Sequence, residues 1–263
     1  MNPDVEDRLR KSFADHLIVD FDPKEDLEEL VTPQARIVVA GGDGTVEFIV
    51  RKLAESKHPI GIIPLGTFNN LARALGLPIE VDKAIEVARG GHARPITLGR
   101  VNEHIFVEAC AIGLFGETIA LGESAKGMEF GKLAARLKDV FAARRFRYKL
   151  SGDLDGGGSA MSLVFSNTAS IGNQLPIGDS TPMKSLLEFA VYAGSTRADI
   201  VARALRSMVL QQHEETAAQV FRFRRLEVTT KPRVRVYADN LHVGSTPATV
   251  TAETSAVKVL LPR

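Results

Sequence analysis

The sequence has little that would tie it to an extracellular or membrane environment. Its 263 residues include one cysteine, Cys110, and no tryptophan. A single cysteine excludes an internal disulfide and is typical of a reducing cytoplasm, and its apolar neighbours favour a core position over a catalytic one. No apolar run approaches the roughly 20 residues of a membrane-spanning helix, and the polar, acidic start is unlike a signal peptide. The formal net charge of +1 argues against a general nucleic-acid binder.

What is present is the composition of an ordinary globular protein, with 44% apolar and 25% charged residues, and a length that suits two domains. Strand patterns alternate with helical patterns as far as the pair Gly90-Gly91, which predicts a parallel α/β domain over residues 1–92. Beyond this pair the patterns are mostly those of strands. They predict a β-rich, sandwich-like domain over residues 93–263.

The expected elements follow from these patterns. In the first domain we expect helices at 4–14, 23–31 and 82–89 and a strand at 16–21, besides the two strand–loop–helix units described below. In the second we expect helical segments near 124–144 and 196–212 and strands at 96–101, 104–112, 147–153, 160–168, 187–193, 221–229, 233–238 and 256–261. The stretch 152–160 should be a hairpin connection. The basic segment 143–150 is either an interfacial patch for anionic lipid or a helix end that leads into an edge strand.

The most informative stretch is IVVAGGDGTVE, residues 37–47. A β-branched run predicts a buried strand, and Thr45 opens a helical pattern. Gly41, Gly42 and Gly44 permit a tight turn and leave no Cβ to block a ligand that approaches the backbone. The N-terminus of a helix presents unpaired N–H groups and partial positive charge, so this turn is suited to phosphate. Asp43 would repel a phosphate unless it binds Mg²⁺, orients a hydroxyl or accepts a proton, which makes it the candidate catalytic residue. A tight turn with a solvated Asp43 is the alternative.

A second unit of the same kind follows in IGIIPLGTFNNLARALGLP, residues 60–78. A strand ends at Leu65, Gly66-Thr67 forms the turn, and Asn69 or Asn70 is a natural N-cap for the next helix. Turns at the carboxyl ends of successive parallel strands belong on the ligand-binding edge of an α/β sheet. The candidate nucleotide-binding residues are therefore Gly41, Gly42, Asp43, Gly44, Thr45, Val46, Glu47, Gly66, Thr67, Asn69 and Asn70.

GGDGT at 41–45 together with PLGTFNNLARALGLP at 64–78 resembles the diacylglycerol kinase catalytic-domain family, which contains bacterial lipid kinases. This family is related to the sphingosine kinases and, more distantly, to NAD and 6-phosphofructo kinases. Weaker similarity continues through FVEACAIGLFGETI (106–119), residues 130–150 and VFSNTASIGN (164–173). The resemblance implies a kinase that uses ATP and Mg²⁺ to phosphorylate a hydroxyl of diacylglycerol or a similar lipid. In NAD and sphingosine kinases the aspartate of the GGDG loop is the proposed base, and Asp43 holds that position here.

The chain also departs from the family pattern. The family usually opens with a strand and an Asn-Pro-x-Ser-Gly turn, whereas Asn2-Pro3 precedes an expected helix. The family's Asp-Asp-Gly segment, which supplies a magnesium site, corresponds to STPMKSLLEFAV (180–191), where Lys184 and Ser185 stand in place of the acids. The metal ligands of this chain are therefore left unassigned.

A further departure concerns the family's Asp-Gly-Glu, whose glutamate is proposed to deprotonate the lipid hydroxyl. In the corresponding VYADNLHVGSTP (236–247), Asp239 is retained, Asn240 replaces the glycine and Leu241 replaces the glutamate. Leucine cannot move a proton. General base assistance is worth about 10²- to 10⁴-fold in rate, so its loss would slow the reaction without forbidding it.

Three hypotheses follow. The chain is an ATP-dependent lipid kinase, or a catalytically impaired member of the same family that regulates by binding nucleotide or lipid, or an NAD kinase. The pair Asn102-Glu103 superficially matches the Asn-Glu substrate motif of NAD kinases, but a hairpin turn is expected there. The expected partner is a lipid substrate and not a nucleic acid. Peripheral contact with a membrane and a homodimer are left open.

Overall fold

The computed structural model describes residues 2–22, 24, 31–32, 35–117, 145–171, 175–193 and 219–263. The chain divides into two compact units, Met1–Ile96 with Ser255–Arg263, and Thr97–Thr254. The sequence places one boundary near residue 92, whereas the first unit also takes in the last residues of the chain. The reason is that the final strand returns to the first sheet. None of the helices in the described ranges is long and apolar enough to cross a membrane.

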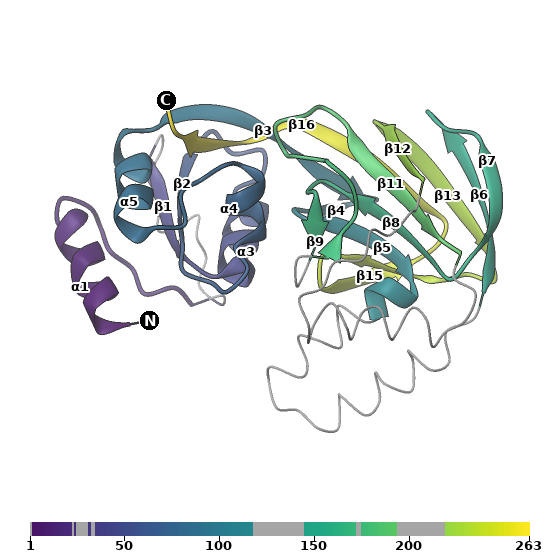
Figure 1. Ribbon diagram of the computed structural model, residues 1–263, viewed down its shortest axis with the longest axis horizontal. Helices are drawn as coiled ribbons and strands as arrows, with labels where there is room; N and C mark the ends of the chain where they lie inside the picture. Colours follow the sequence, from purple (N-terminus) through teal and green to yellow (C-terminus); the bar gives the residue numbers. More distant parts are fainter. Residues whose placement is uncertain are drawn as a thin grey trace, which may run out of the picture. The chain divides into compact units, whose positions relative to one another are not determined.

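The first unit is an α/β layer structure built on parallel strands (Figure 1). Strand β1 (Ile37–Gly41) pairs in parallel with β2 (Pro59–Pro64), and β2 pairs in parallel with the second half of β16 (Ala248–Leu261). Helices α1 (Pro3–Ser12) and α5 (Val81–Gly90) cover one face, while α3 (Asp43–Lys52) and α4 (Asn70–Ala74) cover the other. This order places the ends of β1 and β2 directly before the two glycine loops.

Small residues set the close packing of α5 on the sheet. A Cβ added to Gly61 of β2 would lie 3.0 Å from the Cβ of Ala88, so helix and strand are in direct contact. Leu9 and Phe13 of the N-terminal segment join Ile63 and the alanines of α5 in one buried cluster. Burial of such apolar surface is the main force that holds helices on a sheet.

The second unit is a β-sandwich. One antiparallel sheet has the order β12 (Val220–Phe223), β11 (Leu187–Tyr192), β8 (Ser162–Ser166), β5 (Ala109–Gly113), β14 (Arg235–Ala238) and β15 (Leu241–Ser245). The other contains β7 (Gly156–Ala160), β6 (Phe146–Gly152), β13 (Arg225–Lys231) and the first half of β16. Strands β3 (His92–Val101) and β4 (His104–Phe106) pair with each other, and β9 (Ser170–Ile171) pairs with β10 (Leu175–Pro176).

The sandwich core is rich in phenylalanine. Phe165 stacks on Phe189 with ring centroids 4.9 Å apart, and Phe223 meets Phe165 edge-on. Apolar residues of β6, β13 and β16 complete the same buried cluster. The predicted fold class, an α/β domain followed by a β-sandwich-like domain, is confirmed.

Two predicted strands are each divided in two by an aspartate from elsewhere in the chain. The expected strand 104–112 becomes β4 and β5, because the carboxylate of Asp239 takes the backbone N–H groups between them. The expected strand 221–229 becomes β12 and β13, because Asp153 accepts hydrogen bonds from the amides of Arg224 and Arg225. Asp153 therefore has a structural role that the hairpin prediction did not include.

The strand predicted at 16–21 is wrong. Residues 17–22 are irregular, and Leu17 is 78% exposed. The segment leads from α1 on one face of the first sheet towards α3 on the other. There the ring centroid of Phe21 lies 5.3 Å from that of Phe48 in α3. The helices expected near 124–144 and 196–212, and most of the one at 23–31, lie outside the described residues.

Candidate functional site

The site predicted from the sequence consists of two loops, each between a strand end and a helix. Strand β1 ends at Gly41 and α3 begins at Asp43, two residues before the predicted start. The backbone N–H of Leu65 donates to the carbonyl of Gly41 at 2.8 Å, which ties the second loop to the first. In the described part of the chain no side chain caps α3. The first N–H groups of this helix, which lack acceptors within the helix, therefore point out of its start.

Glycine allows the two loops to touch. A Cβ added to Gly66 would lie 2.8 Å from the Cα of Gly42 and 2.9 Å from Oδ1 of Asn69. A Cβ on Gly42 would meet the Cα of Gly66 at 3.4 Å. The expectation that Gly42 leaves space for a ligand is thus corrected, because its missing side chain faces the neighbouring loop. Gly44 is different: it is exposed, and an added Cβ would have nothing within 4 Å.

Asp43 joins the loops through its carboxylate. Its Oδ2 accepts a hydrogen bond from the backbone N–H of Asn69 at 2.9 Å, and its Oδ1 accepts one from Asn70 at 2.7 Å. Asp43 is half-buried and accepts both of these hydrogen bonds, which argues against the alternative of a tight turn with a solvated Asp43. Its negative charge occupies the N-terminus of α4, where the helix dipole favours an anion. Phosphate is therefore more readily placed at the start of α3 than at the start of α4.

Asn69 holds the shape of the second loop. It has the left-handed backbone conformation, with φ of 54°, which asparagine tolerates better than most residues. Its Oδ1 accepts from the N–H of Gly66 at 2.9 Å and its Nδ2 donates to the carbonyl of Gly66 at 2.8 Å. Asn69 is the N-cap of α4, as predicted, but the side chain that caps the helix belongs to Asp43.

The structure brings all the predicted nucleotide-binding residues into these two adjoining loops and the first turn of α3. Val46, Asn69 and Asn70 are buried, so their side chains face the protein interior. Gly44 and Thr67 are exposed, while Thr45 and Glu47 are half-buried. The backbone of the first turn of α3 is accordingly the part most accessible to a phosphate.

In the second unit, Asp239 is a structural residue. It is 7% exposed, and its carboxylate accepts hydrogen bonds from the backbone N–H groups of Val107 (2.9 Å), Glu108 (2.9 Å) and Ala109 (3.1 Å). Leu241, which stands where the family has its proposed base, is 47% exposed. This position therefore has a surface location and no group that accepts a proton. Burial raises the pKa of the nearby Cys110 thiol, so this cysteine is inert, as expected.

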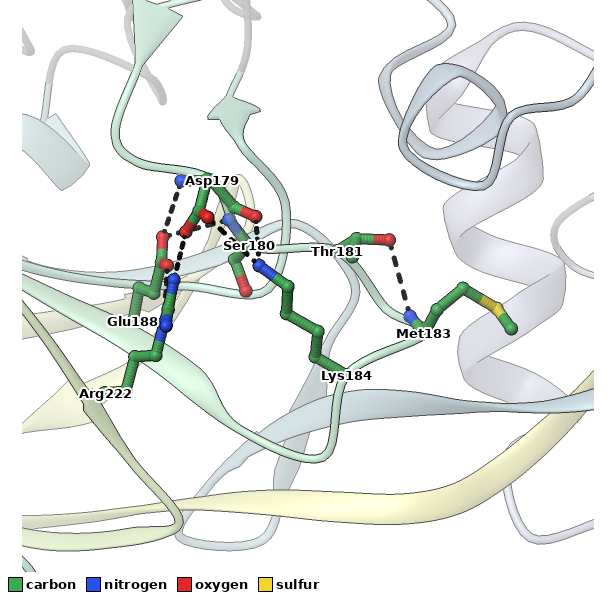
Figure 2. A network of polar contacts seen from close by, with 7 residues as sticks. All are labelled: Asp179, Ser180, Thr181, Met183, Lys184, Glu188 and Arg222. Carbon is green, nitrogen blue, oxygen red and sulfur yellow. Dashed lines mark hydrogen bonds and ion pairs between the residues drawn. The ribbon is translucent and has the colours of Figure 1, made fainter.

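A cluster that the sequence prediction missed surrounds Asp179 (Figure 2). It contains Lys184, one of the two residues that replace the family's acids, together with Glu188 and Arg222. The hydrogen bonds that Asp179 shares with Glu188, Arg222 and Lys184 hold its pKa well below the usual range, whereas burial and the neighbouring Asp179 raise the pKa of Glu188. The available signal was an acid inside the apolar strand SLLEFAV.

Asn167 was also missed as a structural residue, although it lies in the quoted stretch VFSNTASIGN. It is fully buried at the end of β8, and its Nδ2 donates to the carbonyls of Thr97 (2.9 Å) and Val107 (3.0 Å). An asparagine after an apolar strand was the signal. Asn167 and Asp239 thus both fix the connection between β4 and β5.

Comparison with known proteins finds relatives of this chain. Residues 2–101 match the family model of the diacylglycerol kinase catalytic domain. A Bacillus subtilis protein named diacylglycerol kinase is 27% identical over 236 residues, which cover 86% of this chain and 78% of that protein. A diacylglycerol kinase of Staphylococcus carnosus is 42% identical over 83 residues, or 31% of this chain and 27% of the relative.

Solved structures share the fold at low identity. A diacylglycerol kinase from Bacillus anthracis superposes with a TM-score of 0.62 at 19% identity, covering 86% of this chain and 75% of the other. An NAD kinase from Archaeoglobus fulgidus, solved in complex with ATP, gives a TM-score of 0.57 at 14% identity over 100% of this chain and 90% of the other. The resemblance of this chain to the diacylglycerol kinase catalytic-domain family is therefore confirmed, with residues 2–101 matching the catalytic-domain model.

Proposed function

We propose that the chain is an ATP-dependent lipid kinase that transfers a phosphoryl group to a hydroxyl of diacylglycerol or a similar lipid. The catalytic-domain match over residues 2–101 and the alignment with a protein named diacylglycerol kinase over 86% of the chain support this class. The NAD kinase solved with ATP shares the fold, which is consistent with nucleotide use. ATP would supply the phosphoryl group, and Mg²⁺ would arrive bound to it.

The observation that carries the proposal is the open space at Gly44. A Cβ there would meet nothing within 4 Å, and the first N–H groups of α3 point out of the same turn. Phosphate binds readily at such a helix start, because the N–H groups and the helix dipole both favour negative charge. These residues fit the phosphates of ATP, which Gly44 and Thr45 would bind through their backbone.

The chain's own residues would contribute mainly by positioning. Phosphoryl transfer depends on alignment and charge neutralisation more than on covalent chemistry by the protein. Asp43 holds the two loops together, and Gly42 and Gly66 let them meet. A role for Asp43 as the base stays a prediction, and it would require the carboxylate to serve the substrate while it also binds the amides of Asn69 and Asn70.

The second candidate is a member of the same family that binds nucleotide or lipid without turnover. Leu241 favours it, because this position lacks the carboxylate of the family's proposed base. Within the described ranges there is also no group of three or more histidine, cysteine or acidic residues that could hold a metal ion. Both observations argue against turnover, and neither affects the loops around Gly44, where a nucleotide would bind.

The NAD kinase alternative has less support. Asn102 lies in the turn between β3 and β4, with φ of 53°. Its Oδ1 accepts a hydrogen bond from the N–H of Thr249 at 2.9 Å, and its own N–H donates to the carbonyl of Thr249 at 2.8 Å. The pair Asn102-Glu103 is thus explained by turn structure.

The test uses the full chain with ATP labelled on the γ-phosphate, Mg²⁺, and vesicles that contain diacylglycerol or other lipids. We expect label in phosphatidic acid, and in a calorimetric titration we expect Gly44→Val to weaken ATP binding by more than about ten-fold. Gly90→Val is the matched control, because Gly90 also lies in a helix with nothing within 4 Å of an added Cβ.

The outcomes separate the hypotheses. ATP binding without label in any lipid would favour the regulatory reading, and label in NAD would favour the NAD kinase. Equal ATP affinity of Gly44→Val and Gly90→Val would refute the placement of the phosphates at α3.

A further inference from the structure

The acid-and-cation cluster of Asp179, Lys184, Glu188 and Arg222 holds one loop of the second unit (Figure 2). Glu188 and Arg222 lie on the neighbouring strands β11 and β12, while Asp179 and Lys184 lie on the loop that precedes β11. The cluster therefore attaches a loop to the surface of a sheet. Its charges balance, with two carboxylates and two cationic side chains.

Glu188 is the buried member of the cluster, and the loop is attached to it. It is 2% exposed, and its Oε2 accepts hydrogen bonds from the backbone N–H groups of Asp179 and Ser180, both at 3.0 Å. Its Oε1 lies 3.3 Å from Nε of Arg222. Gly178 permits this approach, since a Cβ there would lie 2.1 Å from Oε2 of Glu188.

Lys184 binds two oxygens of a single residue. Its Nζ donates to the backbone carbonyl of Asp179 at 2.7 Å and lies 3.3 Å from Oδ2 of the same residue. The other carboxylate oxygen, Oδ1, lies 2.6 Å from Nη2 of Arg222. A carbonyl and a carboxylate oxygen that converge on one point are ligands that hard divalent cations take in proteins, but here an ammonium group occupies that point.

This geometry does not fit the magnesium ion that the family resemblance implies for the region. Mg²⁺ requires about six oxygen ligands at roughly 2.0–2.1 Å, and a lysine ammonium has only donors to offer. Its positive charge would also repel the ion at close range. The residues present therefore fit an internal cation and not a bound metal.

We infer that Lys184, together with Arg222, takes the place of a divalent cation in this chain, so that the loop 177–184 is fixed without metal. The two positive charges neutralise Asp179 and Glu188 as one divalent ion would. The cluster also fixes the backbone of the loop. Glu188 accepts hydrogen bonds from the N–H groups of Asp179 and Ser180, and Lys184 donates one to the carbonyl of Asp179. This inference does not depend on kinase activity.

The experiment measures thermal unfolding of the full chain without nucleotide, in EDTA and in excess Mg²⁺ or Ca²⁺. We expect the wild type to have the same midpoint in all three solutions. Lys184→Asp gives the cluster a third carboxylate, so we expect its midpoint to fall by several degrees in EDTA and to recover when either ion is added. Calorimetric titration of that variant with Ca²⁺ should show binding that the wild type lacks.

Lys184→Met removes the charge and keeps the length of the side chain, and we expect a lowered midpoint that no metal restores. The matched control is Lys83→Met, because Lys83 pairs with Glu80 at 2.7 Å on an exposed helix surface and should contribute little. A wild-type midpoint that rises with Mg²⁺ would overturn the inference. So would a Lys184→Met variant as stable as Lys83→Met, or a Lys184→Asp variant that neither ion restores.

Discussion

Asp43→Asn should destabilise the protein, because the carboxylate of Asp43 accepts two backbone hydrogen bonds, from Asn69 at 2.9 Å and from Asn70 at 2.7 Å. An asparagine has one acceptor oxygen, and its NH₂ group would face the second backbone N–H. A hydrogen bond to a charged group contributes about 1.5–3 kcal/mol, and an unsatisfied donor costs about 1–3 kcal/mol. Since Asp43 is half-buried, we expect a loss near the lower end, about 2 kcal/mol.

A loss of this size should lower the midpoint of thermal unfolding by roughly 4–8 °C for a chain of this length. The assay is circular dichroism on heating, without ligand. Asp82→Asn is the matched control, because Asp82 also lies in the first turn of a helix but is 72% exposed and makes one surface ion pair, with Arg8. That control should lose less than about 1 kcal/mol. Equal midpoints for the two variants would refute the structural role of Asp43.

Three further predictions concern the second unit. Asp239→Ala should lower the free energy of unfolding, measured with urea, by at least about 3 kcal/mol, because three buried backbone N–H groups lose their acceptor. A smaller loss would mean that other acceptors replace the carboxylate. The backbone N–H groups of Arg224 and Arg225 lower the pKa of Asp153, so the stabilisation by its carboxylate should be present above about pH 4 and be lost as pH falls through the lowered pKa. In the Asp153→Asn variant the midpoint of thermal unfolding should therefore fall less steeply as the pH is lowered below about 4 than in the wild type. An equally steep fall in the two proteins would contradict this. Leu241→Glu restores a carboxylate at an exposed position and should leave the fold intact with little gain in lipid phosphorylation, whereas a gain of about 10²-fold or more would show that the base alone was missing.

The fold could be read from the sequence where local signals and long-range pairing agree. The runs before Gly41 and Leu65 are strands, and the glycine turns after them lead into helices. The pattern at 16–21 misled, because an apolar run predicts burial but cannot say that the chain must travel from one face of a sheet to the other. Strands β7 and β15 were missed, the first because GGGSA has little strand propensity.

The sequence predicts that the two loops of the candidate site lie together, but it does not predict the hydrogen bonds that hold them. The two loops lie in contact as their position after parallel strands indicates, and their binding of nucleotide stays a prediction. The contacts of Asp43 reach residues 26 and 27 positions away, and those of Asp239 reach back 130 to 132 positions. Such partners depend on tertiary structure, which no local pattern encodes. The same holds for Arg222, which meets Glu188 from another strand.

Strand β16 has a consequence for the order in which the protein can form during synthesis. Its second half, through Lys258 and Val259, supplies a neighbour to β2, while its first half pairs with β13, and Ser255 with φ of 59° lies where the two halves meet. A ribosome makes the chain from the N-terminus, and domains usually complete in that order. Here the first unit waits for some of the last residues to be translated, so the strand edge of β2 stays unpaired while the whole second unit emerges. A fragment that stops at Ile96 would keep that edge exposed and should be prone to aggregation.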